Sequence, residues 1–502
     1  MVFRLRRWAA RGWRRPTRVG SVLLLGLLVR EAFSFWTGHP YDFESWIRTA
    51  YVVAHGQNPY SAFWPAVPGL SFSYLGTTLT SAAYLPFWPL LLGALYQFWA
   101  AVGHGNRFVF YFLLKQPGIL ADVASAYLLN ALAVRWTNNR RLGLRLATFW
   151  SFFPYAIIIT AIWGQFDAIV VLLLLLLLYA RGPLERNLVN GIGILVKWLT
   201  VIFLPLELFR ERGWRRASWL VALLIPGLVT VAVFAAMHWT LAPFGTQGLA
   251  SVALSQSRGE GLGMNYAFLL GLGPVTTVLD RVPEFYTVMP YLWVPGVIFA
   301  GRTAARWVRP SSPGLELRAL LLVVTVFLLL RWGLYEQYLL YLFGLFVLDV
   351  VIFHPGRAPL FRVSVAVGLA DLVVNNDFGL RFLGPIDTGL PSLTTQLDAN
   401  DSYGLVRTVL LILLAVAVTA TLIQIALTYL RDEPAPLPWP HEVVRRLRGR
   451  RGPTTHRRTE GTGEEPRSGR ELERKPALAT RTEAESEMSR PEVAESSRGG
   501  HE

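Results

Sequence analysis

Long apolar runs recur along this chain, separated by shorter polar or basic stretches. Residues 170–180 read VVLLLLLLLYA, and several other runs approach the roughly 20 apolar residues needed to cross a bilayer core. A segment inside a bilayer must satisfy its own backbone hydrogen bonds, so it forms a helix or part of a closed barrel. These runs lack the polar–apolar alternation of barrel strands. The pattern predicts an all-α fold, a polytopic transmembrane helical bundle.

Arginine clusters indicate how the helices are oriented. Seven arginines precede the first apolar run, a predicted helix over 19–37, so the positive-inside rule places the basic N-terminus, 1–18, in the cytoplasm. Further arginine clusters are expected on the same side, at 135–145, 181–186, 210–216, 302–309, 357–362 and from 431 onward. The loops expected on the outer side are 38–106, 240–284 and 375–404.

Two stretches do not fit a simple count of spans. Residues 77–102 contain Pro86, Pro89 and many aromatics, which favours a segment at the membrane interface, whereas 107–136 should cross. Residues 187–209 are too short for two spans, which predicts a re-entrant hairpin of half-helices bent near Lys197. We therefore expect about 10 full spans plus this hairpin, within a transmembrane domain over 19–430.

Composition and charge agree with a membrane protein. Of the 502 residues, 53% are hydrophobic and 16% are charged, against about 25% charged in soluble domains. The net charge of +15 suggests nucleic acid or a membrane as partner. Because the arginines flank apolar runs, we expect membrane lipids and no nucleic acid. The absence of cysteine excludes disulfides, thiolate metal sites and a cysteine nucleophile. Residues 431–502, rich in Arg, Glu, Pro, Ser and Gly, predict a disordered cytoplasmic tail.

The first outer loop carries an acidic pair, Asp42 and Glu44, in HPYDFESW. A helix is expected to start after Pro40, with Asp42 at its cap and Glu44 in its first turn, where the helix dipole favours ionised carboxylates. This pair has two possible interpretations: it is a catalytic centre, or it consists of ordinary acidic residues at the start of a surface helix.

A second polar motif, WGQFD, places Gln165 and Asp167 at the outer turn between two predicted spans. Such a turn needs some polarity, so these residues indicate either a site or an ordinary helix end. The aromatic residues Trp163 and Phe166 are interpreted as interface anchors.

Lysine is rare, and two of the three lysines lie inside apolar segments. These are Lys115 and Lys197, while Lys475 lies in the predicted tail. A cation at mid-membrane costs about 2.5 to 3.5 kcal/mol, so it faces a partner such as a lipid phosphate or a carboxylate. For Lys115 two alternatives are snorkelling toward the interface and pairing with Asp122, one or two turns further along its helix.

A late segment, RWGLYEQY, concentrates polar groups at an outer helix connection. They are Arg331, Glu336, Gln337 and Tyr338. The concentration indicates a polar site, and the alternative is an interfacial loop with its anchors.

Together these motifs resemble the GT-C membrane glycosyltransferases over roughly residues 19–430. The first loop of that family carries D-x-D or D-x-E, matched by Asp42-Phe43-Glu44, and the G-Q-x-D turn, the intramembrane lysine and the E-Q-Y segment follow in order. The resemblance is nearest to the mannosyltransferases that use dolichyl- or polyprenyl-phosphate-mannose, such as the catalytic subunit of the GPI mannosyltransferase.

The resemblance implies an inverting transfer of a hexose, with mannose as the first candidate, from a polyprenyl- or dolichyl-phosphate donor. The acceptor would be a hydroxyl on a lipid or glycan, and the reaction would take place outside the cytoplasm. Asp42 would be the general base, supported by Glu44. The residues expected at the donor phosphate are Lys197, Arg331, Arg258 and Lys115. The residues expected at sugar and acceptor hydroxyls are Gln165, Asp167, Glu336, Gln337 and Tyr338. Both termini would be cytoplasmic, in the cell membrane of a prokaryote or the endoplasmic reticulum of a eukaryote.

No metal ion is assigned from the sequence. A divalent cation, Mg or Mn, would use Asp42, Glu44 and Asp167, but metal-dependent oligosaccharyltransferases supply two carboxylates from the second turn where this chain has one. The rival function is a transporter or a lipid-linked-sugar flippase. In that case the intramembrane charges would line a path, namely Lys115, Asp122, Lys197 and Asp371. The acidic residues of these motifs concentrate on the predicted outer side of the membrane, and this favours the transferase over a transporter.

Overall fold

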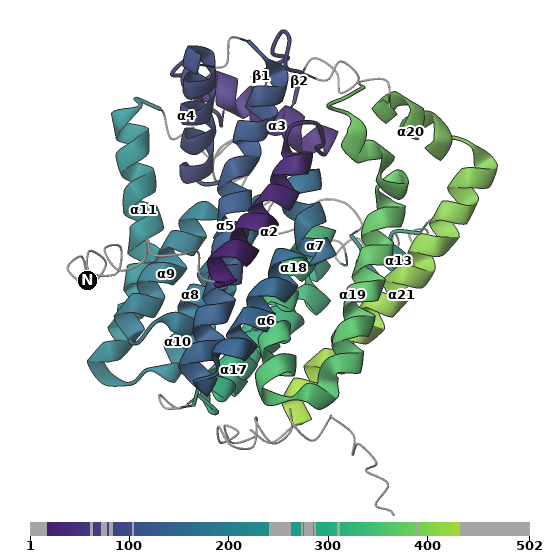
Figure 1. The fold of residues 1–502 in the computed structure, drawn as a ribbon. Helices are drawn as coiled ribbons and strands as arrows, with labels where there is room; N and C mark the ends of the chain where they lie inside the picture. Colours follow the sequence, from purple (N-terminus) through teal and green to yellow (C-terminus); the bar gives the residue numbers. More distant parts are fainter. Residues whose placement is uncertain are drawn as a thin grey trace, which may run out of the picture. The chain divides into compact units, whose positions relative to one another are not determined.

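The computed structural model describes residues 18–60, 64–71, 78–79, 84–102, 105–239, 263–272, 275, 285, 288–308, 312–387 and 390–431. These residues are almost all helical (Figure 1), which confirms the predicted class. The chain divides into two compact units, Met1–Arg448 and Gly449–Glu502, and all described residues belong to the first. The predictions for the N-terminal 17 residues and for the tail after Arg431 lie outside the described residues.

The elements follow in chain order. The first half comprises α2 (Arg18–Ser34), α3 (Pro40–Ala54), the paired strands β1 (Trp64–Pro65) and β2 (Thr78–Leu79), α4 (Phe87–Val102), α5 (Arg107–Thr137), α6 (Arg140–Ser151), α7 (Pro154–Ile157), the π-helix η2 (Ile158–Trp163), α8 (Asp167–Tyr179), α9 (Pro183–Val196), η3 (Trp198–Phe203), α10 (Leu204–Arg210), η4 (Gly213–Ser218) and α11 (Trp219–Ala236). The second half comprises α13 (Tyr266–Leu270), η5 (Met289–Tyr291), α16 (Trp293–Ala305), α17 (Pro313–Leu330), η6 (Glu336–Tyr338), α18 (Leu339–Leu348), the π-helix η7 (Asp349–Phe353), η8 (Pro355–Arg357), α19 (Ala358–Asn375), η9 (Asp377–Leu383), α20 (Leu390–Asp398) and α21 (Asp401–Arg431).

Within the described part of the chain, six helical segments are long and apolar enough to cross a bilayer. They are Arg107–Thr137, Arg215–Ala236, Pro313–Leu330, Glu336–Phe353, Pro355–Asn375 and Asp401–Arg431. The bent pair Arg140–Ser151 and Pro154–Trp163 would bring the count to seven. At 17, 16 and 13 residues, α2, α4 and α8 are shorter than a full span. By their length and composition these helices suggest a membrane protein, and ten spans stay a prediction.

Large apolar side chains on the outer helices are exposed. Leu228 on α11 is 66% exposed, and Leu413 on α21 is 61% exposed. Both helices carry further exposed leucines and valines along their length. Soluble monomers rarely expose contiguous apolar surface of this extent, so these faces suit contact with lipid tails.

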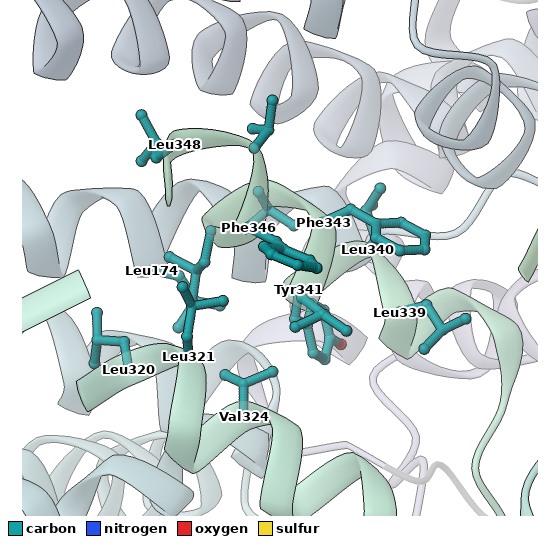
Figure 2. Close-up of a cluster of buried hydrophobic side chains, with 14 of the residues drawn as sticks. Leu174, Leu320, Leu321, Val324, Leu339, Leu340, Tyr341, Phe343, Phe346 and Leu348 are labelled. Atoms are coloured by element: carbon teal, nitrogen blue, oxygen red, sulfur yellow. The ribbon is translucent and has the colours of Figure 1, made fainter. Parts of the chain in front are cut away.

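The centre of the bundle is the apolar segment that starts at Glu336. Its span Glu336–Phe353 is 94% buried inside the protein. Figure 2 shows its side chains, including Leu340 and Phe346, beside Leu321 of α17 and Leu174 of α8. A helix that is apolar on all sides belongs in a protein core. The polar start of the segment, Glu336 to Tyr338, is buried as well.

The predicted break at Lys197 is confirmed. Helix α9 ends at Val196, Lys197 is extended with φ −150° and ψ 109°, and η3 begins at Trp198. The chain folds closely back on itself here, because a Cβ added at Gly193 would lie 2.6 Å from Thr200 Oγ1. The unwound backbone and its cation are buried in protein, as a break at membrane depth requires.

Several segments that were predicted to lie on the outer side of the membrane gather at one end of the bundle. Figure 1 shows α3, α4, the strand pair and α20 at the top of the view, whereas α10 and the C-terminal end of α21 lie at the bottom. Helix α4, predicted to lie at the interface, packs against α3. The described parts of the first and last predicted outer loops therefore share one end.

Candidate functional site

Asp42 lies at the start of α3 and is held by residues from two segments. His39 is the N-cap and Pro40 begins the helix, so Asp42 occupies the first turn, and the expectation that it forms the cap was wrong. Its Oδ2 lies 3.2 Å from His39 Nδ1 and accepts a 2.6 Å hydrogen bond from Trp163 Nε1. A hydrogen bond with Gln165 completes the set.

These partners keep the Asp42 carboxyl ionised. Burial raises the pKa of Asp42, but the hydrogen bond and charge of His39 oppose it, and so do hydrogen bonds from Trp163 and Gln165. The net result is a pKa below the ordinary aspartate value of 3.8. The Asp42 side chain is 21% exposed, whereas those of Glu44 and Asp167 are fully buried.

Glu44 has a different environment, although it is only two residues away. Its Oε1 accepts a 2.5 Å hydrogen bond from Arg48 Nε, and both side chains are fully buried. Residues two apart point to different sides of a helix, so Glu44 does not join the Asp42 centre. The structure separates the acidic pair that the sequence suggested as one catalytic unit.

The WGQFD turn follows the π-helix η2 and faces Asp42. Gly164 has φ +95°, and a Cβ there would lie 2.5 Å from the Phe43 ring, so this position requires glycine. Gln165 is buried, and its Oε1 has no hydrogen-bond partner among the described residues. Trp163 and Phe166 are 5% and 1% exposed, which contradicts their interpretation as interface anchors, because each packs inside the protein.

Asp167 and Lys197 form a buried ion pair. Lys197 Nζ lies 2.8 Å from Asp167 Oδ1 and 2.9 Å from Oδ2, and Tyr341 donates a hydrogen bond to the same carboxylate. The ammonium lies 4.9 Å from the centre of the Tyr338 ring. Of the two partners that the sequence left open for Lys197, a carboxylate or a lipid phosphate, the structure supplies the carboxylate.

The E-Q-Y segment is buried at the start of the central span. Asn375 Nδ2 donates a 2.6 Å hydrogen bond to Glu336 Oε1, and the Oε1 of buried Gln337 has no partner among the described residues. Arg331, at the end of α17, lies 5.2 Å from the centre of the Tyr338 ring. The segment is therefore a polar layer inside the bundle rather than an exposed interfacial loop.

Most of the predicted residues lie in one region. The pKa of Tyr84 is raised by burial and by the nearby Asp42, Tyr338 and Asp167. Asp42 and His39 are also close enough to Glu336 for their charges to act on it. The first loop, the WGQFD turn and the E-Q-Y segment thus converge, as expected from the sequence.

Lys115 lies near this region but does not pair with Asp122. Asp122 Oδ2 instead accepts from Arg30, at 2.7 Å, with both side chains fully buried. Lys115 Nζ donates to Ala161 O at 2.5 Å and to Thr37 Oγ1 at 3.0 Å, and the side chain is 1% exposed. Snorkelling is therefore also wrong for Lys115.

The three carboxylates named for a divalent cation do not fit one. Asp42 is bound by His39 and Trp163, Glu44 by Arg48, and Asp167 by Lys197. Among the residues that the structure describes, no three His, Asp or Glu side chains are placed to hold a metal ion. Arg258 lies outside the described residues.

Three residues of the site were missed or misread from the sequence. His39 stands three residues before Asp42, a spacing that brings the two together around a helix start, and this signal was available. Asn375 is a polar residue that closes the apolar helix α19. Trp163 was noted only as an anchor, because its bond to Asp42 spans 121 residues of sequence.

The chain was also compared with known proteins. No protein-family model matches it, and no curated protein sequence matches it either.

Proposed function

We propose that the chain is an integral-membrane inverting glycosyltransferase. It would move a hexose, with mannose as the first candidate, from a polyprenyl- or dolichyl-phosphate donor to an acceptor hydroxyl. One observation carries the proposal. In a region of buried polar groups, Asp42 is 21% exposed, whereas Glu44 and Asp167 are 0% exposed and ion-paired. Asp42 is the carboxylate that an incoming hydroxyl can reach, which is the first requirement for a general base.

The proposed reaction is a single displacement. The acceptor oxygen attacks the anomeric carbon and passes its proton to an Asp42 carboxylate oxygen. The bond from the anomeric carbon to the phosphate oxygen breaks, and the lipid phosphate leaves with that electron pair. Attack opposite the leaving group inverts the anomeric configuration. His39, Trp163 and Gln165 would keep Asp42 ionised and aimed.

Other groups of the site suit the two substrates. The buried Oε1 atoms of Gln165 and Gln337 lack partners among the described residues and would accept hydrogen bonds from sugar hydroxyls. The cations of Lys197 and Arg331, both against the Tyr338 ring, would place positive charge beside the departing phosphate. In this assignment Asp167 positions Lys197 through their ion pair, and Asn375 positions Glu336 through its hydrogen bond.

The test is a transfer assay with purified protein. Dolichyl-phosphate-mannose and dolichyl-phosphate-glucose are each offered with short mannosides and glycolipids as acceptors, with and without EDTA. We expect a product from one donor, with the anomeric configuration opposite to that of the donor. Loss of activity with EDTA would show that a divalent ion is needed.

The transporter alternative predicts a different result. Protein reconstituted in proteoliposomes would then move a lipid-linked sugar between leaflets without breaking its glycosidic bond. Movement of intact donor without transfer to any acceptor would contradict the proposed function.

A further inference from the structure

Lys115 is a buried cation with neutral partners. It is 1% exposed, and no carboxylate of the described residues forms an ion pair with it. Its Nζ donates instead to Ala161 O at 2.5 Å and to Thr37 Oγ1 at 3.0 Å, and it lies 5.5 Å from the centre of the Phe43 ring. The charge of Glu31 acts on the Lys115 ammonium, but the two side chains form no ion pair. Burying an ammonium without a direct counter-ion is unfavourable, so these contacts need an explanation.

Lys115 Nζ also donates to Phe33 O of α2 at 3.5 Å, and its two closer partners, Thr37 and Ala161, lie beside the Asp42 centre. Thr37 stands two residues before His39, and Ala161 stands two residues before Trp163. The two short segments are also joined to each other, because His39 N donates to Trp163 O at 2.9 Å. The Thr37 hydroxyl lies 3.1 Å from Ala161 O and shares its proton between that carbonyl and Phe33 O, at 2.8 Å. Lys115 therefore sits where the chain entering α3 meets the turn that supplies the Trp163 donor.

The backbone of that turn explains why a strong donor is useful there. Ala161 belongs to the π-helix η2, a rare geometry that ends at Trp163 and is followed by Gly164 with φ +95°. Carbonyl groups near a helix end lack helical partners, and a buried carbonyl without a partner is costly. Ala161 O instead receives hydrogen bonds from Lys115 and Thr37. The ammonium thus satisfies a carbonyl at the end of the π-helix η2.

We propose that Lys115 is a positioning residue for Asp42, and not a ligand of the donor phosphate. By joining the segments of Thr37 and Ala161, it holds His39 and Trp163 in register so that both face the Asp42 carboxylate. This inference rests on the proposed function, because the group it positions is the proposed base.

Steady-state kinetics distinguish this role from phosphate binding. In Lys115→Met, kcat should fall about 10-fold to 100-fold because the base is misplaced, while KM for the donor stays unchanged. The acid limb of the kcat profile should move to higher pH, because Asp42 loses well-aimed donors that lower its pKa. A raised donor KM with an unmoved acid limb would overturn the proposal in favour of phosphate binding. Lys475→Met is the matched control and should match wild type.

Two further variants guard against a simple loss of folding. Thr37→Val preserves the shape of the side chain and removes the hydroxyl shared by Lys115 and Ala161, so it should move the acid limb in the same direction by a smaller amount. Lys115→Arg keeps the donors and should recover part of the rate lost in Lys115→Met. If both variants behaved as wild type while Lys115→Met yielded only unfolded protein, Lys115 would be purely structural and the proposal would fail.

A readout without sugar transfer separates this proposal from the proposed function. The chain has no cysteine, so Asp42→Cys introduces a single thiol at the centre. Adding Lys115→Met should change the rate of its alkylation by iodoacetamide at least about 5-fold, because the donors around position 42 shift. Equal rates would overturn the positioning role. Failure of wild type to transfer any sugar would instead refute the proposed function and leave this readout valid.

Discussion

At the residue scale, Asp42 and Glu44 show how environment separates two neighbouring carboxylates. Asp42 accepts a hydrogen bond from Trp163 and remains partly exposed, while Glu44 is fully buried against Arg48. An accessible ionised carboxylate can accept a proton from a substrate, whereas a buried carboxylate paired with an arginine is shielded from substrate. The catalytic assignment therefore narrows from the pair to Asp42.

The lowered pKa of Asp42 gives a prediction for the pH dependence of the rate. A base with a pKa below 3.8 stays ionised as the pH falls, so kcat should be flat from neutral pH to about pH 5 and fall only in the more acidic range. Trp163→Phe removes one donor that lowers this pKa, and its acid limb should therefore lie at higher pH. The measurement is kcat against pH for both proteins. A wild-type acid limb near pH 6 would contradict this account.

Residue types and local spacing predicted part of the site. The sequence pointed to Asp42, Gln165, Glu336 and Lys197, since polar residues beside apolar runs are costly unless they have a role. It ranked Asp42 above Glu44 as the base, but it placed both carboxylates in one centre. Contacts such as Arg30 with Asp122 depend on how distant helices are rotated against each other, which a single sequence does not specify.

At the element scale, the break between α9 and η3 is fixed to α8 by a buried ion pair. Lys197 lies in the break, and Asp167 opens α8 and is also bonded to Tyr341. Removing one member of such a pair leaves an uncompensated buried charge, which is far worse than removing both charges. The ion pair therefore keeps both buried charges compensated where the backbone is unwound.

This arrangement predicts a non-additive effect on stability. Lys197→Met should destabilise the protein by about 3 to 5 kcal/mol, because the Asp167 carboxylate loses its counter-ion. Adding Asp167→Asn removes that charge and keeps an acceptor for Tyr341, so the double variant should recover much of the loss. Thermal unfolding in detergent measures both. A double variant less stable than Lys197→Met would contradict the account.

The elements themselves were predicted unevenly. Long apolar runs located α5 and α21 within a few residues, and the lysine inside an apolar run located the break at Lys197. The π-helix η2 was not predicted, because its sequence, IITAIW, has the same pattern as an ordinary apolar helix. Local pattern predicts the presence of a helix but not the insertion that turns Trp163 toward Asp42.

At the scale of the whole molecule, the proposed function requires the two ends of the bundle to face opposite sides of the membrane. Helix α3 lies at one end in Figure 1, and the C-terminal end of α21 lies at the other. Asp42 belongs to the first turn of α3, and Arg431 is the last residue of α21. The positive-inside rule predicts that the arginine-rich end faces the cytoplasm. The topology proposed from the sequence and the placement of the site therefore depend on each other.

Single cysteines test this topology, because the chain has none of its own. Gln57→Cys lies on an exposed turn after α3, and Gly356→Cys lies on an exposed turn before α19. In intact cells, or in sealed microsomes with known sidedness, a membrane-impermeant maleimide should label only the position on the extracytoplasmic side, which we expect to be Gln57→Cys. Labelling of Gly356→Cys from that side would reverse the orientation and contradict the proposed location of the site.

The most direct measurement is the kcat of Asp42→Asn in the transfer assay, with Asp401→Asn as its matched control. Asp401 is also an aspartate in the first turn of a helix, and it is exposed on α21. We predict that Asp42→Asn lowers kcat about 100-fold to 10,000-fold at an unchanged yield of folded protein, while Asp401→Asn keeps the wild-type rate. Wild-type turnover by folded Asp42→Asn would show that Asp42 is not the base, and would contradict the central claim.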